Sequence, residues 1–286
     1  LASATRFPSA ARRHAGRRQL RGSVAQSASD GSVHGHHPRR TGRGTLMTAS
    51  NKAPALEIAQ LHTWYGESHI LHDVNLKVEQ GEVVTLLGRN GAGRTTTLRA
   101  IMGLTGARTG SIKVHGVEAI GLATHKIAHL GIGYCPEERG IFSSLSTEEN
   151  LMLPPTLASG EKGMSVEEIY AMFPNLQERR HSQGTRLSGG EQQMLAVARI
   201  LRTGARLLLL DEISEGLAPV IVQGLARMIT TLKAKGYTIV MVEQNFRFAA
   251  PLADRFYVME HGQIVETFAA SELEAKMPVL TELLGV

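Results

Sequence analysis

The chain has 286 residues, of which 42% are hydrophobic and 20% are charged, a composition typical of a globular protein rather than of a disordered or fibrous one. No apolar run approaches the ~18 residues that a membrane-spanning helix needs, so we expect that this chain does not cross a bilayer by itself. The single cysteine, Cys135, excludes an internal disulfide and a multi-cysteine zinc site.

The formal net charge of +5 is unevenly distributed along the chain. Residues 1–46 contain nine arginines and one aspartate, a net charge of +8, which leaves −3 for the remaining 240 residues. This segment has too few apolar residues to offset the entropy of folding, so we expect it to be disordered. The composition of residues 1–46 is compatible with a transit peptide or with a segment that binds nucleic acid or anionic lipid. We favour a third interpretation, in which these residues are upstream sequence and the protein starts at Met47. We therefore expect the folded body to span residues 47–286.

The body begins with regular hydrophobic patterns. Residues 56–58 and 70–78 alternate like strands, and residues 83–87 are almost wholly apolar, as in a strand that is buried on both faces. A glycine-rich loop, residues 88–93, comes next, and residues 95–102 are predicted to form a helix. This strand, loop and helix order is the context in which phosphate-binding loops occur.

The second half of the body alternates between helical and strand patterns. Residues 138–187 are polar and favour helices, with prolines as breaks. Residues 206–210 and 238–242 are two further apolar runs, and each is followed directly by acidic residues. Strands that alternate with helices predict an α/β core with a largely parallel sheet.

Residues 88–95 read Gly-Arg-Asn-Gly-Ala-Gly-Arg-Thr and match the phosphate-binding pattern G-x-x-x-x-G-K-[ST], except that Arg94 replaces the lysine. The glycines allow backbone N–H groups to converge on phosphate oxygens, and the dipole of the following helix favours the same negative charge. Thr95 would place its hydroxyl on Mg²⁺. By itself the loop could also be a tight connection between a strand and a helix.

Two further motifs follow. Residues 207–212, Leu-Leu-Leu-Leu-Asp-Glu, have the form of a Walker B strand, in which Asp211 would hold the metal and Glu212 would take a proton from attacking water. The alternative is that two acids merely end a buried strand. Residues 188–191, Ser-Gly-Gly-Glu, have the spacing of a capping box and start a helix whose N–H groups could grip a γ-phosphate. The alternative here is a well-capped helix without further function.

With these three motifs in this order, residues 55–286 resemble the nucleotide-binding subunit of an ABC transporter, in particular the LivF-type ATPase of branched-chain amino-acid importers. The resemblance implies an α/β P-loop NTPase fold with a mixed sheet core, an antiparallel β part and a helical subdomain at about residues 138–187. It implies that the chain hydrolyses ATP with Mg²⁺. Each ATP would lie between the phosphate loop of one subunit and residues 188–190 of another.

The resemblance also assigns roles to individual residues. Tyr65 matches the aromatic residue that stacks on adenine, although it could be an ordinary half-buried strand residue. Glu137 stands where most of the superfamily has a glutamine, and Gln244 replaces the usual switch histidine. Glu212, Gln244 and Glu137 are thereby implied in catalysis, and Thr95 and Asp211 in holding the metal. The implied ATP-binding residues are Tyr65, Gly88, Asn90, Gly91, Ala92, Gly93, Arg94, Thr95, Thr96, Ser188, Gly189 and Gly190.

Two of these residues depart from the pattern of the superfamily. The resemblance assigns Arg94 to the β- and γ-phosphates. Arginine is bulkier than lysine and planar, so we expect Arg94 to preserve both ATP binding and hydrolysis, at a rate that the exchange can slow. Glutamine cannot carry the charge available to histidine, so we expect no switch-histidine titration from Gln244. A poorly hydrolysing regulatory cassette is the alternative that these two residues suggest. A soluble ABC ATPase acting on nucleic acid is suggested only by residues 1–46.

The partners implied by the resemblance are a second ABC ATPase subunit (the same chain or a related one), transmembrane permease subunits and, indirectly, a periplasmic solute-binding protein. No nucleic acid is expected. The location implied is the cytoplasmic face of a bacterial inner membrane, and the solutes are branched-chain amino acids or related small solutes such as urea and amides. Four hydrophobic residues would form either a socket for a permease helix or a small local core: Ile141, Phe142, Leu145 and Leu151.

Overall fold

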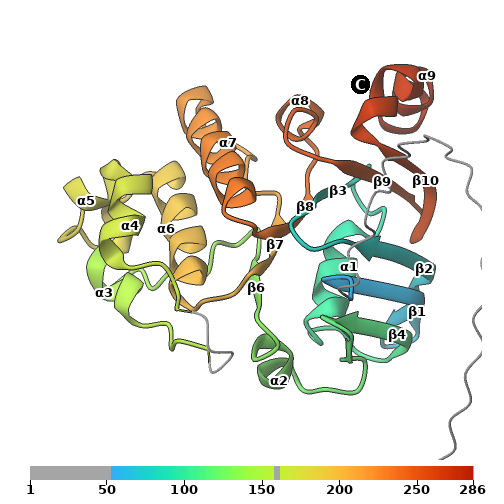
Figure 1. Cartoon of the computed structure of the whole chain (residues 1–286), viewed down its shortest axis with the longest axis horizontal. Coiled ribbons are helices and arrows are strands. Elements are labelled where there is room, and N and C mark those ends of the chain that lie inside the picture. Colours follow the sequence, from blue (N-terminus) through green and yellow to red (C-terminus); the bar gives the residue numbers. More distant parts are fainter. Residues whose placement is uncertain (1–52, 158–161, 286) are drawn as a thin grey trace, which may run out of the picture. The chain divides into compact units, whose positions relative to one another are not determined.

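Two β-sheets organise the protein, whose computed structural model describes residues 53–157 and 162–285 (Figure 1). The expected arginine-rich head, residues 1–46, and its boundary at Met47 lie outside the described residues. The smaller sheet is antiparallel and has the strand order β2-β1-β4-β5. Its strands are β1 (Leu56–Tyr65), β2 (Ser68–Val78), β4 (Arg108–Val114) and β5 (Val117–Glu118).

The larger sheet has six strands in the order β10-β9-β3-β8-β7-β6. All its neighbouring strands are parallel except β10, which pairs antiparallel with β9. The carboxyl ends of the parallel strands therefore meet at one edge of this sheet. The strands are β3 (Val83–Gly88), β6 (Ile132–Cys135), β7 (Leu207–Asp211), β8 (Thr238–Val242), β9 (Arg255–Glu260) and β10 (Gln263–Ala269).

Helices α1 to α8 lie in the connections between strands, and α9 follows β10. In Figure 1, α3 to α6 lie together on the side away from the antiparallel strands β1, β2 and β4. Among the described residues, no helix combines the length and the apolar character that crossing a bilayer requires. The helices are α1 (Arg94–Ile101), α2 (Thr124–Ala128), α3 (Thr147–Met152), α4 (Val166–Met172), α5 (Pro174–Glu178), α6 (Gly189–Arg202), α7 (Pro219–Ala234), α8 (Phe246–Ala249) and α9 (Leu273–Leu284).

Strand β7 shows how the sheet separates two hydrophobic clusters. Leu208 and Leu210 belong to a cluster with α6 and α7, whereas Leu207 and Leu209 belong to a cluster with α1 and the antiparallel sheet. Successive residues of a strand point to opposite faces. All four side chains are buried because a hydrophobic cluster covers each face. The apolar run in the sequence thus has its predicted meaning of a strand buried on both faces.

The four hydrophobic residues considered for a partner socket have different environments. Leu151 is completely buried in the cluster around α6, and Ile141 packs partly buried against the same cluster. Leu145 is partly buried, and Phe142 is 50% exposed, with the guanidinium of Arg199 4.8 Å from the centre of its ring. Leu151 is therefore a core residue, as the alternative interpretation had it, and Phe142 is the one best placed to meet a partner.

Candidate active site

Four strand ends create the site. The phosphate loop leaves β3, and Glu137, Glu212 and Gln244 follow β6, β7 and β8. This is the edge of an α/β sheet at which ligands characteristically bind. A cavity of about 520 Å³ lies there. It is lined by eleven of the residues predicted from sequence: Tyr65, Asn90, Gly91, Ala92, Gly93, Arg94, Thr95, Thr96, Glu137, Glu212 and Gln244.

The phosphate loop is tightly constrained at its two ends. A Cβ atom on Gly88 would lie 2.6 Å from the carbonyl oxygen of Met259, and one on Gly93 would lie 2.8 Å from a methyl carbon of Leu71. Gly93 also has a φ of 104°, in the region that favours glycine. It is followed directly by α1, whose first-turn N–H groups have no partners within the helix. The loop and this helix end can therefore present N–H groups to an anion.

Thr95 and Asp211 meet beneath the loop. The Thr95 hydroxyl donates to one carboxylate oxygen of Asp211 at 3.0 Å, and the Tyr134 hydroxyl donates to the other at 3.0 Å. Burial raises the pKa of Asp211 above its ordinary value, although these two hydrogen bonds oppose the rise. Hydroxyl and carboxylate oxygens are the donors that Mg²⁺ prefers, so the predicted pair fits a magnesium ion chemically.

Arg94 lines the cavity and donates its hydrogen bonds to protein acceptors. One terminal nitrogen donates to the backbone carbonyl of Glu243 at 2.8 Å, and the other forms an ion pair with Glu212 at 2.9 Å. The side chains of this pair are only 4% and 9% exposed. Burial lowers the pKa of Arg94, and the surrounding carboxylates oppose that shift. The arginine is therefore held on the same carboxylate that the sequence predicts as the general base.

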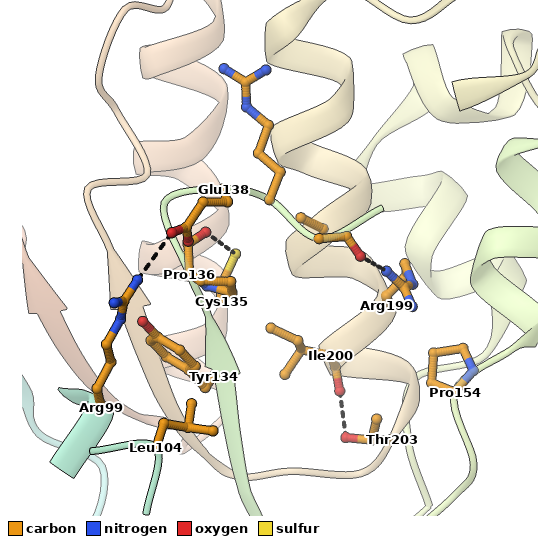
Figure 2. A pocket seen from close by; sticks show the side chains of 13 residues that line it. Arg99, Leu104, Tyr134, Cys135, Pro136, Glu138, Pro154, Arg199, Ile200 and Thr203 are labelled. Atoms are coloured by element: carbon orange, nitrogen blue, oxygen red, sulfur yellow. Dashed lines mark hydrogen bonds and ion pairs between the residues drawn. The ribbon is translucent and has the colours of Figure 1, made fainter. Parts of the chain in front are cut away.

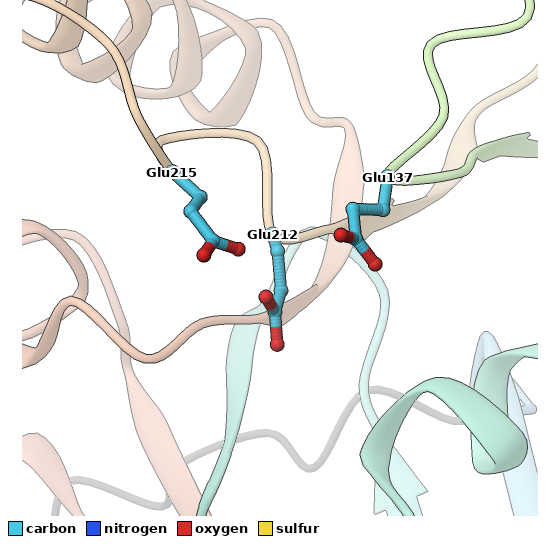
Figure 3. A group of neighbouring side chains, drawn as sticks. All are labelled: Glu137, Glu212 and Glu215. Atoms are coloured by element: carbon cyan, nitrogen blue, oxygen red, sulfur yellow. The ribbon is translucent and has the colours of Figure 1, made fainter. Parts of the chain in front are cut away.

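Glu212 is held from a second side by Gln244, whose side-chain amide donates to its two carboxylate oxygens at 3.2 and 3.1 Å. The backbone of Glu212 has a φ of 47°, a left-handed conformation that is uncommon for residues other than glycine. Figure 3 shows that Glu212 and Glu215 come from the loop after β7 and Glu137 from the segment after β6. Oxygens of the three carboxyl groups lie within 4.8 Å of one another. The hydrogen bond between Glu215 and Glu212 raises the pKa of Glu215.

Sequence reasoning missed several residues around the site. Glu215 and Ile70 line the cavity, and Tyr134 supports Asp211. Glu243 is 2% exposed, and its carboxyl group accepts hydrogen bonds from the backbone N–H of Ser214 at 3.1 Å and from its hydroxyl at 2.8 Å. Burial raises the pKa of Glu243 to about 7. Only its place at the end of an apolar strand, beside Gln244, could have drawn attention to it.

Residues 188–190 lie apart from the other predicted site residues and do not line the cavity that the structure describes. Ser188 caps α6: its hydroxyl accepts from the backbone N–H of Glu191 at 3.3 Å, and the Glu191 carboxylate accepts from the Ser188 N–H at 2.7 Å. Arg139 donates to the side chain of Gln192 on α6 at 3.0 Å. The predicted capping box is thus confirmed by its hydrogen bonds.

Comparison with known proteins places these motifs in a family. Residues 71–215 match the family described as ABC transporter. The high-affinity branched-chain amino acid transport ATP-binding protein BraG of Pseudomonas aeruginosa is 43% identical over 211 residues, which cover 73% of this chain and 91% of BraG. The probable branched-chain amino acid transport ATP-binding protein LivF of Archaeoglobus fulgidus is 33% identical, covering 76% of this chain and 93% of LivF.

Other relatives widen the comparison. The lipopolysaccharide export system ATP-binding protein LptB of Haemophilus influenzae is 33% identical over 227 residues, covering 78% of this chain and 90% of LptB. A crystal structure of a nucleotide-free ATP-binding cassette from an ABC transporter superposes with a TM-score of 0.70 at 21% identity, covering 81% of this chain and 98% of that one. The predicted fold and the predicted resemblance are both confirmed. The chain belongs to the ABC transporter family and is one of its ATP-hydrolysing cassettes.

Proposed function

We propose that this protein is the ATPase subunit of an importer for branched-chain amino acids or a closely related small solute. The observation that carries the proposal is the convergence of the phosphate loop, Glu212 and Gln244 on one cavity of about 520 Å³, with Asp211 bonded to Thr95 of its lining. The chain is 43% identical to BraG and 33% identical to LptB. The higher identity favours a branched-chain amino acid or a related solute over the lipopolysaccharide named for LptB.

The arrangement supports a role for each group in ATP hydrolysis. Backbone N–H groups of residues 91–96 bind the phosphates, and Tyr65, at the rim of the cavity, stacks on the adenine. Thr95 and Asp211 would hold Mg²⁺, which would neutralise phosphate charge when bound. Water attacks the γ-phosphorus as the bond to the bridging oxygen breaks, and Glu212 accepts the proton that the water loses.

Glu212 can act in this way only after Arg94 releases it. The guanidinium that pairs with Glu212 at 2.9 Å is also the group that the sequence assigns to the β- and γ-phosphates. ATP phosphates offer Arg94 a stronger, bidentate partner. We infer that binding of ATP draws Arg94 away from Glu212, while Gln244 keeps the carboxylate oriented.

A second cassette completes the site in this proposal. Residues 188–190 begin α6, do not line the cavity described above and expose a helix N-terminus favourable to anions. Their position supports a head-to-tail pair in which this segment grips the γ-phosphate of an ATP held by the other subunit. The partner cassette is either a second copy or a related ATPase.

The permease subunits would contact the cavity shown in Figure 2. It has a volume of about 590 Å³ and lies between α1, residues 134–140 and α6. Arg99, paired with Glu138 at 3.0 Å, and Arg199, stacked on the exposed Phe142, supply charged and apolar contacts at this surface. We propose that a cytoplasmic helix of the permease docks here, which would place the protein at the cytoplasmic face of the membrane.

A second candidate function, a regulatory cassette that hydrolyses ATP poorly, is favoured by one observation, the buried ion pair between Arg94 and Glu212. Such a pair resists the loss of either partner because a lone buried charge is costly. The two functions differ in turnover, since a regulatory cassette would bind ATP without needing Glu212 as a base.

The experiment is co-expression with tagged permease subunits, followed by ATPase assays with solute-loaded binding protein. We expect co-purification, stimulation by a branched-chain amino acid, and a loss of about 10²–10⁴-fold in kcat for Glu212→Gln. The control is Glu274→Gln, at an exposed site on α9, which should retain full activity. Equal turnover of the wild type and Glu212→Gln would instead support the regulatory cassette.

A further inference from the structure

Three histidines and a tryptophan gather on the outer face of the antiparallel sheet. His62 and Trp64 lie two residues apart on β1, and His69 on β2 stands directly opposite Trp64 in the strand register. Thr63 and Leu71, which pair with each other on the same two strands, are completely buried on the inner face. The cluster therefore faces solvent, and His69 itself is exposed.

A β-bulge adds His72 to the same face. In a regular strand, residues 69 and 72 would point to opposite faces because they are three positions apart. Here the register shifts between the pair Thr63–Leu71 and the pair Trp64–His69, so that one extra residue is inserted in β2. A bulge of this kind redirects the side chains beyond it, and the rings of His69 and His72 accordingly lie 4.0 Å apart.

The ring of His69 is held in place from several sides. It stacks on Trp64 with 4.4 Å between ring centres and 13° between planes, and His72 lies against it as well. Its Nε2 atom lies 3.2 Å from Nδ1 of His62. The contacts with Trp64 and His72 therefore restrict the ring of His69 and hold its Nε2 close to Nδ1 of His62.

The 3.2 Å between His62 Nδ1 and His69 Nε2 is close to the distance between two ligand nitrogens on one zinc ion. Two histidines that bind one zinc ion, each at about 2.0–2.1 Å with tetrahedral geometry, place their nitrogens about 3.3 Å apart. The ring nitrogen of a neutral histidine is a common metal ligand in proteins. Solvent on the open side can supply the remaining ligands.

We propose that His62 Nδ1 and His69 Nε2 together bind a divalent transition-metal ion such as Zn²⁺ on the outer face of β1 and β2, with water completing its coordination. The ion would tie the two strands together immediately before the turn that follows Tyr65. This site is separate from the Thr95 and Asp211 pair and from the carboxyl cluster of Figure 3, both of which belong to the ATP cavity.

The test is calorimetric titration of the full chain with ZnCl₂ in the absence of nucleotide. Because the sequence also contains His34, His36 and His37, all proteins carry His34→Asn, His36→Asn and His37→Asn. We expect one binding event that His69→Asn abolishes and that His129→Asn, at an exposed position after α2, leaves unchanged. Zn²⁺ should raise the Tm of the parent and not that of His69→Asn, since a ligand stabilises only the state that binds it.

Two outcomes would overturn the proposal. Zinc binding that survives His69→Asn and is lost in Glu212→Gln would assign the ion to the ATP cavity. No zinc binding by the parent would leave the contact between His62 and His69 as a hydrogen bond only. Because the titration contains no ATP and reads heat and Tm rather than turnover, its result is independent of whether the protein proves to be an importer ATPase.

Discussion

Arg94 and Glu212 determine each other's position in the ATP cavity. Lysine at position 94 would carry the same charge on a compact ammonium, whereas arginine presents a planar fork of donors. In the structure this fork bridges the Glu243 carbonyl and the Glu212 carboxylate, at 2.8 and 2.9 Å. Arginine at this position of the phosphate loop thus restrains the proposed general base, which lies in the loop after β7.

We predict that Arg94→Lys increases kcat/KM for ATP by about tenfold, because ATP then no longer has to break a charge-assisted hydrogen bond to Glu212, a difference of about 1.4 kcal/mol. The measurement is steady-state phosphate release over a range of ATP concentrations, which separates kcat from kcat/KM. The matched control is Arg89→Lys in the same loop, where the arginine bonds to backbone carbonyls of α9 and not to the catalytic acids. A decrease in kcat for Arg94→Lys would show that the arginine is needed for turnover.

The protonation of Glu243 should make stability depend on pH. Its pKa is about 7 in the folded protein, against an ordinary value of 4.5, so folding favours the neutral carboxyl. The contribution is fully present below about pH 4.5 and is lost as the pH rises through about 7, an effect of about 3 kcal/mol. Urea unfolding at pH 5 and pH 8 should show this loss in the wild type and not in Glu243→Gln. An identical pH dependence in Glu243→Gln would contradict the prediction. The control is Glu274→Gln, at an exposed site, which should show the same loss as the wild type.

At the scale of elements, three helices begin with the same capping box. Ser146, Ser165 and Ser188 each accept from the backbone N–H three residues on, and the glutamate there accepts in return. The local energetics of these caps are therefore alike. Their proposed functions are not, because only the start of α6 is assigned to the phosphate of a partner subunit.

Ser188→Ala and Ser165→Ala should each lower the free energy of unfolding by about 1 kcal/mol, the usual cost of losing a helix cap. Only Ser188→Ala is expected to reduce ATPase activity, by about tenfold, since it also removes a hydroxyl from the proposed γ-phosphate contact. Chemical denaturation and phosphate release measure the two effects separately. Equal activities for the two variants would reduce the role of Ser188 to capping.

At the scale of the whole molecule, the basic net charge belongs to residues 1–46, while the cassette is slightly acidic. We predict that a chain starting at Met47 retains kcat within about twofold, because a segment that cannot bury apolar surface contributes little to a folded site. Phosphate release by the two chains is the measurement. Loss of activity would give the head a function, and salt-sensitive binding of nucleic acid by the shortened chain would revive the nucleic-acid alternative.

Much of the fold was predictable wherever a local pattern repeats. The apolar runs predicted β3, β7 and β8. The glycine-rich loop predicted the start of α1 to within one residue, and Ser188 predicted the start of α6. Strands β4, β9 and β10 were not predicted. Strand β4 pairs with β1 and β9 with β3, both distant in the sequence, and β10 is an edge strand that pairs with β9. A short sequence pattern contains little information about such partners.

The sequence by itself determined the chemistry of this protein: a phosphate loop with arginine, paired acids after an apolar strand and a capped helix, in the order that marks an ATP-hydrolysing cassette. Only the tertiary structure decided that Arg94 pairs with Glu212, that Ser214 holds a buried Glu243, and that a bulge brings His69 and His72 together. Each of these contacts joins side chains whose meeting depends on strand register and burial. Those are properties of the assembled sheets, whereas motif spacing records only what lies along the chain.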